Sequence, residues 1–132
     1  MADLLERCQG GDLDSHYLAF FECFNRQLFF EAHEVLEELW LIRRGTAKDR
    51  FYKGLIQLAG AFVHVQKSRP QPATSLLELA RTNLEPYSPA CDRLQVEALL
   101  ARIERWLEVV RNGGGEGLLS AAELPRVELL VS

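Results

Sequence analysis

The chain has 132 residues, of which 48% are hydrophobic and 26% are charged, and its formal net charge is −4. This composition is typical of a globular domain and excludes a disordered chain, so we assign residues 1–132 to a single helical domain. The net negative charge argues against nonspecific nucleic-acid binding, which requires a basic face. No apolar run approaches the roughly 18 residues that span a membrane.

The spacing of apolar residues predicts an all-α fold, a compact bundle of about five helices with a short extended C-terminal tail. The first helix covers about residues 15–26, and Asp14 or Ser15 supplies its N-cap oxygen. The second covers about residues 29–44 and ends at Gly45, because glycine is favoured directly after a helix. The buried face of the first helix is aromatic: Tyr17, Phe20, Phe21 and Phe24.

A third helix, over about residues 49–67, is apolar on nearly all sides, which predicts a central position in the bundle. One narrow polar stripe, made of Arg50, Lys53, Gln57 and His64, interrupts its apolar surface. Gly54, Gly60 and Ala61 flank this stripe. Small residues allow another helix to approach closely, and the second helix is the expected neighbour because the connection to it is short.

A fourth helix over about residues 70–84 and a fifth over about residues 92–112 complete the bundle, with a proline-containing loop between them. A glycine-rich linker follows at residues 113–117. The apolar tail, residues 124–132, is too short to fold alone. We expect it to lie extended across its own chain; contact with a partner subunit in a homodimer is the alternative.

Three scattered cysteines predict a reducing environment. Cys8, Cys23 and Cys91 lack the spacing of a zinc knuckle or a redox motif. An odd number of cysteines, without an apolar signal segment at the N-terminus, is typical of a cytoplasmic protein. We expect Cys23, at the margin of the aromatic helix, to be a small buried hydrophobic residue.

Two histidines interrupt the apolar surfaces of the second and third helices. His33 and Glu37 are four residues apart, so their side chains meet on one face, and the carboxylate would orient the imidazole. Gln57 and His64 are seven residues apart, which is two turns on one face. If the two helices are antiparallel neighbours, the four side chains converge in one groove.

This groove predicts a module that binds a small anionic ligand or a protein segment. Arg50 and Lys53 would lie toward one end of the groove and supply positive charge. A helical-wheel projection at 100° per residue places Trp40 at the margin of the groove. The predicted groove residues are His33, Glu37, Gln57, His64, Lys53, Arg50 and Trp40. Glu31, Glu34 and Glu38 cluster on the far side of the second helix and are expected to face water.

Two alternatives remain. The stretch from His33 to Glu37 reads HExxE, one letter from the HExxH of zinc proteases, so a metal-dependent hydrolase could use His33, Glu37 and His64 to hold a divalent metal. No other cofactor is expected. In the second alternative the polar side chains form satisfied pairs in a helix interface, and the domain is purely structural or oligomerising.

The segments FNRQLFFEAHEVLEELWL, FYKGLIQLAGAFVHVQK and PATSLLELARTNLEPY resemble the prokaryotic family called domain of unknown function 309, over about residues 20–87. The resemblance implies a compact helical fold and no particular reaction. A glycine is common in that family just before the FFEAHE segment, but residues 25–28 contain none, so the turn there differs. The matching positions are Phe30, Glu31, Ala32, His33, Glu34, Trp40, Gly54, Leu55, Ile56, Gln57, Ala59, Ala61 and His64.

Overall fold

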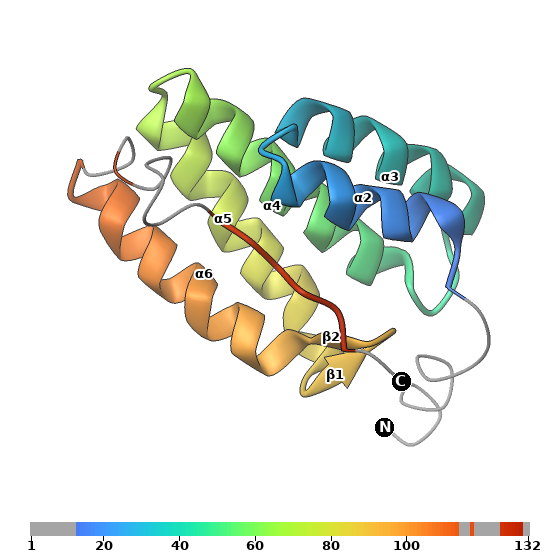
Figure 1. Cartoon of the computed structure of the whole chain (residues 1–132). Coiled ribbons are helices and arrows are strands. Elements are labelled where there is room, and N and C mark those ends of the chain that lie inside the picture. Colours follow the sequence, from blue (N-terminus) through green and yellow to red (C-terminus); the bar gives the residue numbers. More distant parts are fainter. Residues whose placement is uncertain (1–12, 114–116, 118–124, 131–132) are drawn as a thin grey trace.

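The structure is a computed structural model that describes residues 13–113, 117 and 125–130. Within this part the fold is all-α, as predicted, with one small hairpin (Figure 1). The elements are α2 (Ser15–Asn25), α3 (Phe29–Arg43), α4 (Asp49–Gln66), α5 (Pro70–Leu84), the 3-10 helix η1 (Glu85–Tyr87), β1 (Ala90–Cys91), β2 (Leu94–Gln95) and α6 (Val96–Arg111). Among the described residues, no helix combines the length and hydropathy needed to cross a bilayer.

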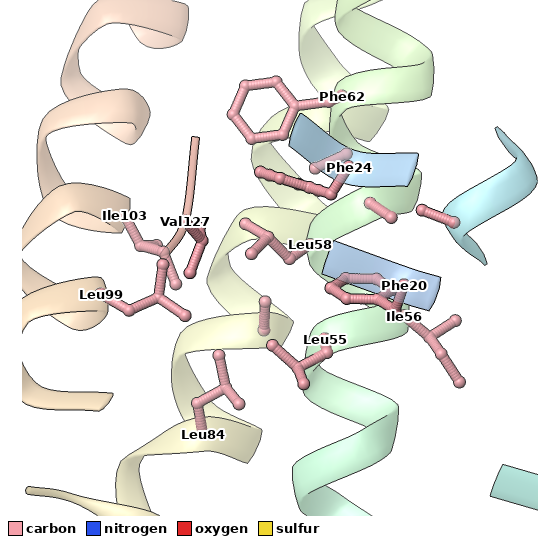
Figure 2. Close-up of a cluster of buried hydrophobic side chains, with 14 of the residues drawn as sticks. Phe20, Phe24, Leu55, Ile56, Leu58, Phe62, Leu84, Leu99, Ile103 and Val127 are labelled. Carbon is pink, nitrogen blue, oxygen red and sulfur yellow. The ribbon is translucent and has the colours of Figure 1, made fainter. Parts of the chain in front are cut away.

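Helix α4 lies in the middle of the bundle, between α3 and α5, while α2 packs on α3 and α6 packs on α5 (Figure 1). This central position follows from its apolar surface, since residues all around its circumference are buried. One hydrophobic core runs through the bundle and includes Phe20 and Phe24 of α2, Phe62 of α4 and Ile103 of α6 (Figure 2).

Local signals fix the ends of the first two helices. Asp14 caps α2, because its Oδ1 accepts a hydrogen bond of 2.7 Å from the backbone N–H of His16. The chain leaves α2 through Gln27, whose φ of 66° lies in the left-handed region that glycine prefers. Gly45 has a φ of 80° just after α3, as predicted for its position.

The small residues of α4 admit a close neighbour, but at Gly54 and Gly60 that neighbour is α5 and not α3. A Cβ on Gly54 would lie 2.8 Å from Cγ of Leu84, and one on Gly60 would lie 3.3 Å from Cδ1 of Leu76. The prediction of close approach is confirmed, whereas the predicted partner is wrong at these two positions. Both connections of α4 are short, so connection length alone could not select the partner.

The fifth predicted helix begins four residues late. Residues 90–95 form an antiparallel hairpin in which Ala90 pairs with Gln95, and α6 starts only at Val96. Both central turn residues have positive φ, 47° at Asp92 and 64° at Arg93, as a two-residue hairpin turn requires. The sequence did not predict this turn, because neither of its two central residues is the glycine that usually marks a two-residue hairpin turn.

The hairpin is fastened to the bundle through its turn. Asp92 is only 7% exposed, and Nζ of Lys48 lies 2.9 and 3.0 Å from its two carboxylate oxygens. The hydroxyl of Tyr17 donates to the backbone carbonyl of Asp92 at 3.0 Å. Burial raises the pKa of Asp92, and Lys48 opposes that shift. The left-handed turn is thereby held against α2 and the start of α4.

The C-terminal tail lies on its own chain, as expected, at least over residues 125–130. Val127 is 5% exposed and belongs to the core, beside Leu99 and Ile103 of α6 (Figure 2). The segment runs along the bundle toward the hairpin (Figure 1). The rest of the predicted tail lies outside the described residues.

Cys91 is buried in the core and Cys23 is half-buried against it. Burial raises the pKa of the Cys23 thiol, and Glu31 and Glu22 add to this shift. A buried thiol with a raised pKa is a packing residue and a poor nucleophile. Cys23 packs against the core as predicted but is half-buried rather than fully buried, and Cys8 lies outside the described residues.

We predict that Gly54→Ala lowers the free energy of unfolding by about 2 kcal/mol, because the added methyl forces α4 and α5 apart and outweighs the gain in helix propensity. Urea denaturation measures the change. Gly60→Ala is the matched control with a smaller expected effect, since its methyl meets only the end of one leucine side chain. Equal effects of the two substitutions would contradict the close approach at Gly54.

We predict that Arg93→Gly raises the free energy of unfolding by about 0.5–1 kcal/mol, because glycine relieves the positive φ and the exposed Arg93 side chain contributes little. Asp92→Gly should instead destabilise the protein, because it removes the ion pair with Lys48. Urea denaturation of both variants tests the turn. Destabilisation by Arg93→Gly would show that this backbone conformation is wrong.

Candidate functional site

A pocket of about 270 Å³ opens between α3, α4 and α5. Three of the predicted groove residues line it: His33 from α3, and Gln57 and His64 from α4. The two imidazoles therefore lie in the wall of one cavity. Its other lining residues are apolar or lack a side chain: Phe30, Ile56, Gly60, Val63 and Leu76.

The His33 imidazole is oriented from outside the pocket. Its Nε2 lies 3.3 Å from a carboxylate oxygen of Glu37, one turn further along α3. The ring of Phe30 stacks on it, with 6.3 Å between ring centroids and 25° between planes. Glu37 is 45% exposed and does not line the pocket, so it acts on the cavity only through His33.

Both histidines carry a buried ring nitrogen without a partner. Nδ1 of His33 and Nδ1 of His64 are inaccessible and form no hydrogen bond within the described structure. Leaving a buried polar atom unpaired costs about 1–3 kcal/mol, so such atoms usually pair with protein, water or a ligand. Two residues of the pocket wall therefore each hold a buried ring nitrogen whose hydrogen-bonding capacity is unused.

The tautomer of His33 decides what its free nitrogen can do. If Nε2 carries the proton and donates a hydrogen bond to Glu37, Nδ1 of the neutral ring is a hydrogen-bond acceptor. Protonation of the ring turns the same atom into a donor. His33 can therefore serve an alcohol or amine in its neutral form and a carboxylate in its charged form.

Gln57 is fixed in the wall by α5. Its Oε1 accepts a hydrogen bond of 2.7 Å from Nδ2 of Asn83. Sequence reasoning missed Asn83 and also Leu76, the residue of α5 that closes the pocket. These two residues are seven apart on α5, which repeats the spacing of Gln57 and His64 on α4. This shared seven-residue spacing was the signal in the sequence that α5 could form a third side of the pocket.

Arg50 and Lys53 do not line the pocket, contrary to the prediction of a positive end to the groove. Arg50 donates from Nε to Oδ1 of Asn83 and from Nη2 to the carbonyl of Thr82, both at 3.1 Å. Lys53 is exposed on α4. The C-terminal end of α5 occupies the space beside the first turns of α4, so these cations lie outside the cavity.

Trp40 also lies elsewhere. Its Nε1 donates to Oδ1 of Asp49 at 2.6 Å, and the Arg44 guanidinium lies 5.2 Å from the ring centroid. The other oxygen of Asp49 accepts from the backbone N–H of Gly45 at 2.9 Å. Trp40 thus closes the turn between α3 and α4. A helical-wheel projection of α3 could not predict this hydrogen bond, because Asp49 belongs to the next helix.

The geometry does not assemble the predicted metal triad. Among the described residues, no group of three or more His, Cys, Asp or Glu side chains is arranged to hold a metal ion. Glu37 faces His33 from outside the pocket that His33 shares with His64. The solvent-facing prediction for Glu31, Glu34 and Glu38 is confirmed by their exposure.

Residues 17–76 match the model of the family described as Domain of unknown function (DUF309). This match confirms the resemblance over these residues. The matched region contains every residue that lines the pocket. Comparisons with curated proteins and with solved structures found no match.

We predict an acid-sensitive contact at the turn between α3 and α4. Hydrogen bonds from Gly45 and Trp40 hold the pKa of Asp49 below its ordinary value of 3.8. A carboxylate with a depressed folded-state pKa stabilises the fold above its unfolded pKa, and this contribution is lost as the pH falls through the folded value. Asp49→Ala should therefore destabilise the protein at pH 7 and have a shrinking effect below about pH 4.

Urea denaturation of wild type and variant across this pH range measures the difference. Glu34→Ala, at an exposed position of α3, is the control and should show little effect at any pH. A penalty for Asp49→Ala that does not change with pH would contradict a role for the charged carboxylate.

Proposed function

We propose that the pocket between α3, α4 and α5 binds a small carboxylate with an apolar body. The description of the matching family names no activity. The observation that carries the proposal is the pair of unpartnered nitrogens, Nδ1 of His33 and Nδ1 of His64, at one cavity. Both nitrogens belong to residues that line a mainly apolar pocket, and such a lining favours a ligand that is apolar over most of its surface and polar at one end.

The size of the pocket limits the ligand. At about 270 Å³ it is slightly smaller than the range of about 300–1,000 Å³ that drug-sized ligands occupy. A single ring or a short branched chain fits this volume. Ile56, Val63 and Leu76 supply the apolar contact, and the absence of a side chain at Gly60 leaves the space open.

The histidines supply the polar end. Arg50 and Lys53 lie outside the pocket, so recognition of an anion depends on the imidazoles. A carboxylate accepts hydrogen bonds, so both Nδ1 atoms would have to carry protons when it binds. The carboxylate of Glu37, 3.3 Å from Nε2 of His33, can accept the other N–H of that ring. If Nε2 of His33 donates to Glu37, His33 can donate from Nδ1 only when its ring is charged, so ligand binding would be coupled to proton uptake there. His64 can donate from Nδ1 as one of its neutral tautomers.

A small ligand is favoured over a protein segment by the shape of the site. The pocket lies in the angle between three helices and is bordered by Phe30, whose side chain is 54% exposed. A metal-dependent hydrolase is less well supported, because the described residues offer no three-ligand cluster.

The test uses phenylacetate as a probe and 2-phenylethanol as its uncharged counterpart. We expect isothermal titration calorimetry of the full chain to show saturable binding of phenylacetate that tightens as the pH falls from 8 to about 6, where imidazoles gain protons. His64→Leu should weaken binding about tenfold or more, the value of a hydrogen bond to a charged group. The same change should not destabilise the fold, because it removes an unpaired buried nitrogen.

Two further variants make this test specific. Gly60→Ala narrows the pocket without altering a polar group and should also weaken binding. His16→Ala should leave binding unchanged, because His16 interacts with Asp14 and Glu38 on another face. Failure of phenylacetate to bind at about 1 mM, or equal loss with His16→Ala, would refute the proposal. Strong destabilisation by His64→Leu would instead indicate a satisfied structural histidine.

A further inference from the structure

The C-terminal segment, residues 125–130, contacts the bundle in the way an extended peptide contacts a receptor. Its side chains alternate: Pro125 and Val127 are buried and Leu129 is half-buried, while Arg126 and Glu128 are exposed. Arg126 and Glu128 pair with each other at 2.6 Å on the outer side. This period of two is that of a strand with one buried face, although no sheet is present here.

The segment is held mainly through its backbone. Nδ2 of Asn25 donates to the carbonyl of Val127, and Oδ1 of Asn25 accepts from the N–H of Val127, both at 2.8 Å. Arg102 of α6 donates to the carbonyl of Arg126. The N–H of Leu130 donates to the carbonyl of Arg93 at 2.7 Å. We call Asn25, Gln27, Arg93 and Arg102 the tail-binding surface.

Gln27 follows Asn25 by two residues in the sequence. It contacts Pro125, which precedes the Asn25 contact, Val127, by two residues. Its Nε2 donates to the carbonyl of Pro125 at 3.1 Å. Its Oε1 is buried and has no partner in the described structure. The side-chain oxygen of Asn25 accepts a hydrogen bond from the N–H of Val127. The side-chain oxygen of Gln27 has no such donor, because Pro125 lacks an N–H. The tail therefore leaves one acceptor of the surface unfilled.

We propose that the tail-binding surface is a recognition site for an extended segment of a partner protein, which displaces the tail of this chain. The favoured segment has a branched aliphatic residue at the position of Val127 and a residue other than proline at the position of Pro125. Such a segment provides the N–H that Oε1 of Gln27 lacks. This proposal is independent of the pocket between α3, α4 and α5.

The backbone of Gln27 supports this assignment. Its φ of 66° lies in the left-handed region, which residues with a long side chain rarely adopt and glycine adopts freely. Glycine would remove this strain and also the side chain that contacts the tail. The surface therefore retains a strained residue whose amide contacts the segment through one of its two polar atoms.

The test measures the affinity of labelled peptides for the full chain by fluorescence anisotropy. Val127→Asp, which places a charge in the core, releases the tail and frees the surface. Three peptides of the sequence of residues 124–132 carry proline, alanine or N-methylalanine at position 125. We expect the alanine peptide to bind about tenfold more tightly than the N-methylalanine peptide, which differs from it only at the backbone nitrogen and lacks the N–H.

Two substitutions provide the controls. Added to Val127→Asp, Gln27→Met should abolish the difference between the alanine and N-methylalanine peptides, because no acceptor remains. Leu130→Asp introduces the same charge at an exposed position of the tail and should leave the surface occupied, so wild type and Leu130→Asp should bind the peptides weakly. Equal affinities of the alanine and N-methylalanine peptides, or no binding by folded Val127→Asp, would show that the tail is only structural.

Hydrogen exchange keeps the proposal testable if Val127→Asp does not fold. In the otherwise unchanged chain, Pro125→Ala should slow exchange of the Val127 amide, since the new N–H at position 125 pairs with Gln27. The same substitution combined with Gln27→Met should not slow it. Faster exchange of that amide in Pro125→Ala, to the same degree in both backgrounds, would refute the role assigned to Oε1 of Gln27.

Discussion

The close approach of α4 and α5 at Gly54 positions the rest of the structure. With no side chain at this point, the helices come near enough for Asn83 to reach Gln57 and for Leu76 to lie opposite Gly60. The polar stripe of α4 therefore faces a helix on each side. His33 of α3 lies on one side of the space between these helices. The pocket forms where Gly60 leaves this space open.

In the described part of the chain, three buried side-chain polar atoms lack a hydrogen bond: Nδ1 of His33, Nδ1 of His64 and Oε1 of Gln27. They fall at two places, the pocket and the tail-binding surface. Proteins rarely leave buried polar atoms unpaired, because each one destabilises the fold. Their concentration at the two pocket-lining histidines and at the contact with the C-terminal segment, rather than across the core, is the common basis of both proposals.

Much of this fold follows from the sequence, because the helices carry strong local signals. Asp14 and Gly45 mark helix ends at the predicted places, and the apolar period identifies the buried faces. The hairpin turn at Asp92 escapes such reasoning, since its positive φ values are stabilised by contacts with Tyr17 and Lys48, which are distant in sequence. The convergence of His33 and His64 was predictable from spacing; the third wall and the displacement of Arg50 depend on how α5 packs.

The most direct test of the pocket is nuclear magnetic resonance of the histidine side chains in ¹⁵N-labelled protein, with and without phenylacetate. We expect the Nδ1 resonances of His33 and His64 to shift together along one saturation curve, while those of His16 stay unchanged. A response of only one of the two rings, separate saturation curves, or an equal response from His16 would contradict a shared site.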